Sequence, residues 1–171
     1  MPASPRSALW FLFGLWLSFA LLLPLLSSRA RAAEGELARL EATLHRAVNG
    51  LRAERGLIAL TRRPELDAVA RAHSQDMASR RYLSHRSPEG ADWVARLESA
   101  GIQGFAMAGE NVGLTSRRQP NLQILEGWKA SPVHRENLVA RFYNATGIGI
   151  ARAADGTLYY TQLYLSFPRD E

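Results

Sequence analysis

Histidine and glutamate at a few isolated positions supply the side chains of this sequence whose chemistry suits catalysis or ligand binding. The histidines stand at positions 45, 73, 85 and 134 of a 171-residue chain. Glu110 stands in the segment AGENVG, with a glycine and apolar residues on each side. Burying a carboxylate in an apolar strand costs free energy unless a cation, a metal or several hydrogen-bond donors receive it. We therefore expect a partner for Glu110 elsewhere in the chain.

The four histidines differ in the patterns around them. His73 lies on the apolar stripe of a predicted helix, which favours a core histidine with its hydrogen bonds satisfied. His45 lies on the polar side of another helix, where we expect it to be solvated. His85 lies in the loop LSHRSPEG, a kind of segment where functional side chains concentrate, and His134 lies near the start of a short helix. Taken alone, His85 and His134 also fit capping or packing roles.

No short motif joins these residues into a known catalytic or metal site. The sequence has no H-E-x-x-H, no Asp-x-Asp calcium loop, no G-x-S-x-G, no P-loop and no G-x-G-x-x-G. The two glycines of GIGIAR lie in a predicted strand with no helix after it, which argues against a nucleotide loop. A serine triad can be drawn from Ser84, Ser116 or Ser131, but such combinations have little specificity in a chain rich in Ser, Asp and Glu.

Two longer helices are predicted from apolar residues that recur at spacings of three and four. The first covers residues 36–55, and its polar side carries Arg39, Glu41, Arg46 and Arg52. The second begins at Pro64. Its buried stripe comprises Leu66, Val69, Ala70, His73 and Met77.

The rest of the chain predicts short helices followed by a hairpin. DWVARLESAG predicts a short helix that ends at Gly101, FAMAGENV predicts a strand, and two further helices meet at Ser131 and Pro132. ATGIGIARAADGTLYYTQLYLSF predicts a β-hairpin around ADGT, with Tyr160, Gln162 and Tyr164 on one face and Thr161, Leu163 and Leu165 on the other. Helices first and strands last indicate an α+β domain with a small antiparallel sheet.

Composition excludes several classes of protein. The formal net charge is +5, but three arginines lie in the N-terminal segment, and without them 18 basic residues face 16 acidic ones. That balance argues against a nucleic-acid partner. The absence of cysteine excludes disulfides, thiol catalysis and thiolate metal ligands.

The N-terminal segment is typical of an export signal. Arg6 precedes an apolar run from Ala8 to Leu26, and the small-residue motif ARA follows at 30–32. The run is longer than a usual signal core and approaches the length of a membrane span, so residues 1–33 are either a cleaved signal peptide or a membrane anchor. Both alternatives place residues 34–171 outside the cytoplasm, in the periplasm or the extracellular space, and only the anchor brings the protein to a membrane.

Six segments in this order resemble one known family: VNGLRAERGLIAL, AVARAHSQDMASRRYLSH, AGENVG, WKASPVHRENL, GIGIAR and LYYTQLY. Together they are similar to the CAP superfamily of cysteine-rich secretory proteins, antigen 5 and pathogenesis-related proteins, also called SCP domains, in its short cysteine-free bacterial form. The resemblance runs from about residue 40 to residue 167. It implies an α-β-α sandwich around a three-stranded antiparallel sheet.

The resemblance also implies a site in a central cleft. By motif, the family's two histidines fall on His85 and His134, and its GEN glutamate falls on Glu110. The family's second glutamate is replaced by Ala130, and Glu126 would substitute only if its helix turned inward. His85, Glu110 and His134 form a ligand set that suits zinc or another divalent metal. We add Asn111 of the GEN segment and Gln162 of the last strand as candidate cleft residues.

Three functions are compatible with these residues. The favoured one is an exported binding module whose cleft takes a small apolar, lipid, peptide or cell-wall ligand, with or without a divalent metal. The second is a metal-dependent hydrolase that uses His85, Glu110 and His134. The third is a serine hydrolase with Ser84 or Ser131 as nucleophile. Binding is favoured over catalysis because no residue is left as a general base once Glu110 is a metal ligand. The sequence leaves the ligand, the oligomeric state and any protein partner open.

Overall fold

The computed structural model describes residues 9–168, with side chains from residue 31 onward. It divides the chain into two units, residues 1–37 and residues 38–171. The predicted export segment, residues 1–33, falls almost entirely outside the residues whose side chains are described. Among the described residues, no helix combines the length and the apolar character needed to cross a membrane.

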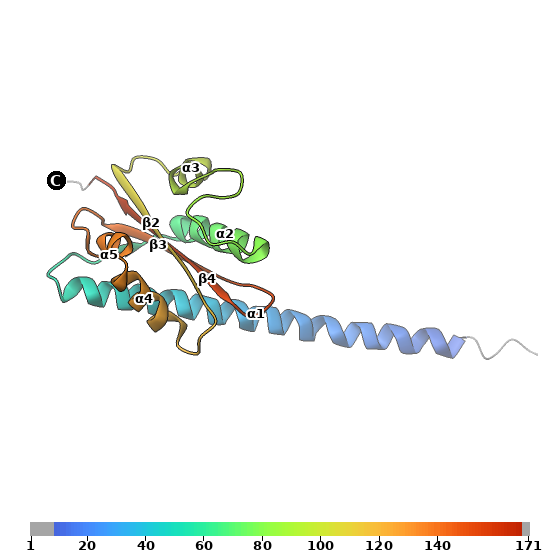
Figure 1. The fold of residues 1–171 in the computed structure, drawn as a ribbon. Helices are drawn as coiled ribbons and strands as arrows, with labels where there is room; N and C mark the ends of the chain where they lie inside the picture. Colours follow the sequence, from blue (N-terminus) through green and yellow to red (C-terminus); the bar gives the residue numbers. More distant parts are fainter. Residues whose placement is uncertain (1–8, 169–171) are drawn as a thin grey trace, which may run out of the picture. The chain divides into compact units, whose positions relative to one another are not determined.

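The elements follow the predicted order of helices first and a hairpin last (Figure 1). The helices are α1 (Leu9–Ala53), α2 (Pro64–Arg80), α3 (Trp93–Ser99), α4 (Pro120–Ala130) and α5 (Pro132–Val139). The strands are β1 (Thr61–Arg62), β2 (Met107–Thr115), β3 (Ala145–Arg152) and β4 (Leu158–Ser166). Three of the helices begin at a proline, whose fixed φ suits the first helical position.

The sheet has four strands in the order β1-β3-β4-β2, so the expected three-stranded sheet is wrong by one strand. The additional strand, β1, pairs parallel with β3. Backbone hydrogen bonds from Thr61 N to Asn144 O (2.9 Å) and from Arg63 N to Thr146 O (3.0 Å) hold it. Two residues are too few to show the alternation by which a strand is recognised in a sequence.

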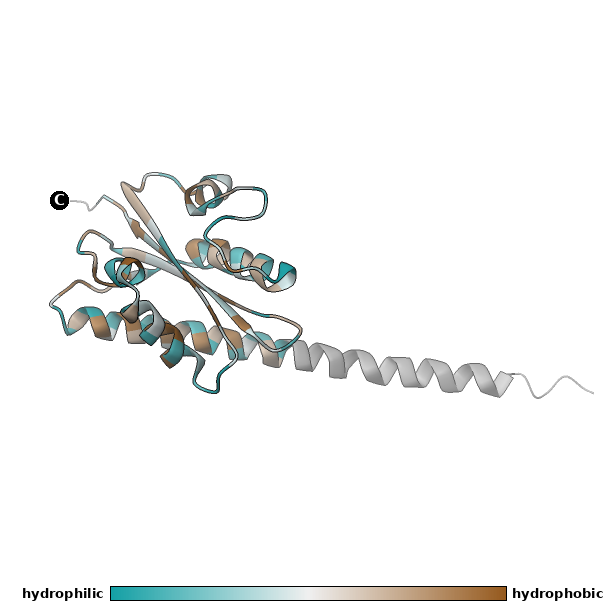
Figure 2. Ribbon diagram, in the orientation of Figure 1, coloured by the Kyte–Doolittle hydropathy of each residue, from teal (hydrophilic) through white to brown (hydrophobic). Residues whose placement is uncertain are grey.

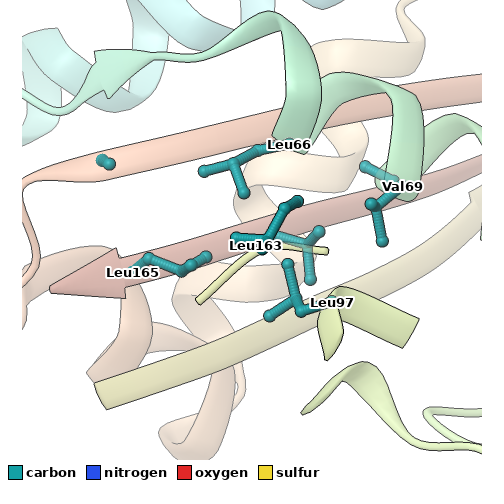
Figure 3. Close-up of a cluster of buried hydrophobic side chains, with 8 residues drawn as sticks. Leu66, Val69, Leu97, Leu163 and Leu165 are labelled. Carbon is teal, nitrogen blue, oxygen red and sulfur yellow. The ribbon is translucent and has the colours of Figure 1, made fainter. Parts of the chain in front are cut away.

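The predicted hairpin and its alternation are confirmed. β3 and β4 pair antiparallel, and the turn between them closes with Ala153 N donating to Thr157 O at 2.8 Å. Leu163 and Leu165 pack with residues of α2 and α3 in one apolar cluster, in which Leu66 and Leu97 are also buried (Figure 3). The other face of β4 turns toward α4, where the Tyr160 hydroxyl donates to Asn121 Oδ1 at 3.0 Å. β2 covers most of the predicted strand but extends to Thr115.

Helices cover both faces of the sheet. α2 and α3 lie on one face, and α4 and α5 lie on the other with the part of α1 from residue 38 onward (Figure 1). Apolar and polar residues alternate around α2 (Figure 2), and the predicted stripe from Leu66 to Met77 is buried. The α-β-α layering that the family resemblance implies is therefore present.

The polar side of α1 is less exposed than its sequence pattern predicts. Glu41 is buried, accepts hydrogen bonds from Arg62 and Arg71, and also accepts the backbone N–H of Ile150 on β3. Arg52 is buried and donates to four backbone carbonyls, those of Ile58, Leu138, Ala140 and Tyr143. Both side chains satisfy polar groups of other segments, which helical periodicity does not reveal.

His45 is also different from the prediction. It is half-buried, and its Nε2 lies 2.9 Å from the carbonyl oxygen of Leu60. The same oxygen accepts a hydrogen bond from Asn49 Nδ2 at 3.1 Å. His45 therefore helps to hold the chain that leads from α1 into β1.

The close approach of α2 to the sheet requires glycine at two positions of β3. A Cβ at Gly149 would lie 2.0 Å from Arg71 N, and one at Gly147 would lie 2.2 Å from the Leu66 carbonyl carbon.

We expect Gly149→Ala to lower the free energy of unfolding by about 1–3 kcal/mol or more, since the backbone of α2 must move. Gly127→Ala in α4 is the matched control. A Cβ there meets nothing within 4 Å, so we expect it to raise stability by up to about 1 kcal/mol. Urea unfolding measures both, and equal effects would contradict the helix position.

Candidate functional site

Glu110 is the centre of the candidate site. It lies on β2 directly opposite Leu163 of β4, so its side chain is on the face of the sheet that α2 and α3 cover. Only 4% of Glu110 is exposed. Its Oε1 accepts a hydrogen bond from His85 Nδ1 at 2.9 Å, and its Oε2 accepts one from Arg96 Nη2 at 2.5 Å. The buried carboxylate therefore has two donors, of which one is a permanent cation.

Arg96 is the partner of Glu110 that sequence analysis missed. It lies on α3, a helix whose N-terminus is capped by Asp92, which accepts the Ala95 N–H at 3.0 Å. Its Nη1 donates to the backbone carbonyls of His85 (3.2 Å) and Ala91 (2.9 Å). One guanidinium thus fixes both the carboxylate and the backbone of the loop that carries His85. No periodicity marks Arg96, and only the requirement that Glu110 meet a donor or a cation points toward such a residue.

The His85 loop is held from two further sides. His73 of α2 is buried, as predicted, and its Nε2 lies 2.9 Å from the carbonyl oxygen of Ser84. The ring of Trp93 packs edge-on against the His85 ring, with centroids 5.9 Å apart. His85 therefore enters the site with its backbone and its ring both positioned by neighbours.

His134 is brought to the site by α5. Its ring centroid lies 5.8 Å from that of His85, at an angle of 45°. Asn111 is buried, and its Nδ2 donates to the His134 carbonyl at 3.0 Å. Asn137 of α5 donates to the Glu110 carbonyl (3.2 Å) and to Asn111 Oδ1 (2.9 Å). Asn111 thus ties α5 to the outer edge of β2 and positions His134, while its own amide has no free group facing a ligand.

Two other candidates lie outside this group. Gln162 is fully buried on the opposite face of β4 and donates to Thr146 Oγ1 at 3.1 Å. Glu126 is exposed on α4 and pairs with Lys129 at 2.7 Å, so it does not take the place of the glutamate that Ala130 replaces. The structure therefore joins His85, Glu110 and His134, whereas Gln162 lies on the other face of the sheet, directly opposite Asn111 in the strand pairing.

The imidazoles near Glu110 differ electrostatically from a solvated histidine. Burial, together with the neighbouring His85, lowers the pKa of His134. Burial also lowers the pKa of His73, although the nearby Glu110 carboxylate opposes the shift. Because a lowered histidine pKa favours the neutral ring, both side chains can accept a hydrogen bond at neutral pH.

These shifts predict a pH dependence of stability. The unfolded chain binds protons at His73 and His134 at a higher pH than the folded chain does, so the free energy of unfolding rises with pH across this window. We expect the free energy of unfolding to fall as the pH drops through the usual pKa of histidine. The fall should end once the pH is below the lowered pKa values of the folded chain. Urea unfolding between pH 8 and pH 5 measures this, and the slope should be smaller in His134→Gln and His73→Gln. An unchanged slope in both variants would contradict the assignment.

The three residues of the expected metal site are together, but Glu110 is not arranged as a metal ligand. Both of its oxygens accept hydrogen bonds, and the guanidinium of Arg96 would repel a cation placed beside Oε2. In the described part of the chain, no group of three His, Cys, Asp or Glu side chains has the arrangement of a metal site. The groups left for a ligand are the Nε2 of His85 and the ring of His134.

A groove of about 540 Å³ adjoins the site between α2 and α3. Arg96 forms part of its wall and also contacts the Glu110 carboxylate, so it belongs to both the groove and the site. The other lining residues are Glu65, Ala68, Val69, Ala72, Ala91, Ser99, Ala100 and Ile102. Most of this lining is apolar.

An α-β-α sandwich with two histidines and a glutamate at the edge of its sheet is the architecture of the CAP class. Residues 45–164 match the family model of the cysteine-rich secretory protein family, CAP, and the chain belongs to that family. It is 33% identical over 117 residues to the "Uncharacterized membrane protein YlbC" of Bacillus subtilis, which covers 68% of this chain and 32% of YlbC. It is 32% identical to the B. subtilis protein YkwD over 67% of this chain and 42% of YkwD. The chain therefore spans less than half the length of these two relatives.

Solved structures agree with the fold. An extracellular SCP-domain protein from Bacillus anthracis is 29% identical, with a TM-score of 0.65 over 75% of this chain and 41% of that one. An outer surface protein from Borrelia burgdorferi has a TM-score of 0.69 at 18% identity, over 76% of this chain and 94% of that one. At this identity the second likeness supports the fold alone.

Proposed function

We propose that this protein is an exported binding module, whose ligand site is formed by His85 and His134 and extends into the adjoining groove. The observation that carries this proposal is the use of both Glu110 oxygens. A carboxylate that accepts from His85 Nδ1 and from Arg96 holds an imidazole in place, and it is not free as a nucleophile or a base. The two rings then offer preorganised donors and acceptors to a small ligand.

Export is supported by the N-terminal pattern and by the descriptions of similar proteins. Residues 1–33 have the order of an export segment. Similar chains include a protein described as extracellular and another described as a membrane protein. We propose that residues 34–171 act outside the cytoplasm, with the N-terminal segment either cleaved or retained as an anchor.

The proposal is tested by identifying what co-purifies with the full chain. Elemental analysis and untargeted mass spectrometry of the wild type should find an organic ligand at a stoichiometric ratio and no stoichiometric metal. His85→Ala and His134→Ala should lose that ligand, while Arg86→Ala, beside the site but exposed, should retain it. Equal retention in all four proteins would contradict a site at the two histidines.

Metal-dependent hydrolysis is the second candidate, and one observation favours it. When one ring N–H of a histidine donates to a carboxylate, its other ring nitrogen is free to bind an ion, an arrangement common among zinc ligands. On this hypothesis His85 and His134 would hold the ion, Glu110 would orient His85, and the ion would supply an acidified water. Because two imidazoles are half of a four-coordinate shell, the binding proposal predicts only weak zinc binding. Calorimetric zinc titration at pH 7.5 tests this. A tight, stoichiometric zinc complex of the wild type that is lost in His134→Ala would favour the hydrolase.

A further inference from the structure

The loop between β2 and α4 carries two neighbouring arginines without partners. Arg117 and Arg118 are exposed, and neither guanidinium forms a hydrogen bond or an ion pair with any residue that the structure describes. Together with Gln119, Leu122 and Gln123 they line a hollow of about 400 Å³ on the surface. Among the described residues that line it, two are cations and none is acidic, so the hollow favours an anion.

This loop is held in place although its arginines are exposed. Thr115, at the end of β2, is buried, and its hydroxyl oxygen accepts the backbone N–H of Arg117 at 3.1 Å. The same hydroxyl donates to the side-chain oxygen of Gln123. Because that oxygen is engaged, the side-chain NH2 of Gln123 is the group that remains for an occupant. Two guanidiniums and an amide NH2 are all donors, a set that suits phosphate oxygens.

An apolar side chain stands beside these donors. Leu122 lies in the first turn of α4 and is 55% exposed. Segments that lie on a membrane surface combine basic side chains, which meet anionic headgroups, with apolar side chains that enter the interface. A phosphate ion in solution would use the arginines and leave Leu122 exposed, whereas a lipid surface would use both.

The same end of the domain receives the chain from the export segment. Asn121 Nδ2 on α4 donates to the Leu40 carbonyl oxygen on α1 at 2.8 Å. Thr115 pairs with Leu158 at the start of β4, so the β2–α4 loop and the β3–β4 turn lie at one end of the sheet (Figure 1). Leu40 stands seven residues after Ala33, and seven residues span at most about 25 Å even when fully extended. A retained anchor therefore keeps this end of the domain close to the membrane.

Other charges at this end do not cancel the two arginines. Arg39 is exposed directly before Leu40. Asp155 in the β3–β4 turn already accepts the Thr157 backbone N–H at 2.9 Å. In the sequence just before Leu40, two acidic residues are balanced by two basic ones, namely Glu34, Glu36, Arg29 and Arg31. Arg117 and Arg118 are therefore positive charge in excess.

We propose that the surface formed by Arg117, Arg118 and Leu122 docks on an anionic lipid membrane in the chain that retains its N-terminal anchor. The guanidiniums bind lipid phosphates at the hollow, and Leu122 enters the interface. The N-terminal pattern predicts membrane contact through the export segment alone, and this surface is a second contact. Because the anchor raises the effective concentration of the membrane, a few groups of modest affinity suffice. The proposal goes beyond the binding function, since it uses no residue of the site at His85 and His134.

The test measures how close the loop lies to membranes of different charge. The chain has no cysteine, so Gln119→Cys provides a single site for a fluorescent label, and Gln119 makes no side-chain cap of α4 that the change would remove. The labelled full chain is reconstituted in phosphatidylcholine vesicles that contain a headgroup nitroxide quencher, with or without phosphatidylglycerol. The anchor is present in every sample, so its own insertion cancels in the comparison. We expect at least about twofold stronger quenching with phosphatidylglycerol, and loss of that difference in about 0.5 M salt, which screens exposed charges.

Two controls separate this surface from net charge and from general contact with the vesicle. Arg117→Gln with Arg118→Gln should abolish the difference between the lipids. Arg135→Gln with Arg141→Gln removes the same charge from exposed positions outside the surface and should retain the difference. A label at Glu54→Cys, just after the other end of α1 and 75% exposed, should not respond to the lipid. Circular dichroism confirms that each variant is folded.

The outcomes distinguish a membrane from other anions. Equal quenching with both lipids, or an undiminished lipid difference without Arg117 and Arg118, would overturn the proposal. Stoichiometric binding of inorganic polyphosphate that needs both arginines, with no lipid-dependent quenching, would reassign the surface to a soluble polyanion. Retention of a co-purified ligand by His85 and His134 is measured separately, so neither result alters the test of the binding function.

Discussion

Replacing Arg96 by methionine is expected to lower the free energy of unfolding by about 3–5 kcal/mol, because it leaves the buried Glu110 carboxylate without its cation. The substitution keeps most of the aliphatic packing of the side chain, so the loss reports the ion pair together with the two hydrogen bonds to the His85 and Ala91 carbonyls. Urea unfolding at pH 8 measures the difference between wild type and variant. At that pH the carboxylate stays ionised in the unfolded chain, and its burial is most costly.

Two further variants separate the ion pair from a general effect of removing an arginine. Arg86→Met removes an exposed arginine from the same loop region, where its side chain is 67% exposed, and should change stability by less than about 0.5 kcal/mol. The double variant Arg96→Met with Glu110→Met should recover much of the loss, since no buried charge is left unpaired. A double variant as unstable as the sum of the single variants would mean that the two side chains are not coupled.

Leu163→Asp is expected to unfold the domain under conditions in which the wild type is stable. Leu163 is fully buried in the cluster with Leu66 and Leu97 (Figure 3), and an unpaired carboxylate there should cost more than about 4 kcal/mol. Leu114→Asp is the matched control on β2, where the leucine is 42% exposed, and should cost less than about 1 kcal/mol. Thermal unfolding followed by circular dichroism checks both. A Leu163→Asp protein with the melting temperature of the wild type would show that the register of β4 is wrong.

The elements could be predicted where one face of a helix or strand is buried. The stripe from Leu66 to Met77 and the alternation of β4 follow from that burial, so their residues carry the pattern. A short extended piece was expected before Pro64, but the pairing of β1 with β3 could not be predicted, because a strand of two residues has no period. Glu41 and Arg52 were misplaced on the polar side of α1 because their partners lie in distant segments, and no local pattern records those. Glu41 pairs with two arginine side chains and one backbone N–H, and Arg52 pairs with backbone carbonyls.

The residues of the candidate site could also be predicted only in part. His85, Glu110 and His134 were assigned together through the family resemblance, and the structure brings them together. The residues alone required only that Glu110 have a partner. They did not name Arg96, whose helix is seven residues long and has too few turns to show a stripe. Gln162 was expected in the cleft, but the pleat of β4 turns it to the opposite face, toward Thr146.

The most direct test of this account is nuclear magnetic resonance of the imidazole nitrogens of His85 at alkaline pH. If Glu110 holds His85, the proton lies on Nδ1 and Nε2 is the free acceptor. We predict the Nδ1–H tautomer as the main form in the wild type, and a larger share of the Nε2–H tautomer in Glu110→Gln. A main Nε2–H tautomer in the wild type, or the same tautomer ratio in both proteins, would contradict the role of Glu110 in orienting His85.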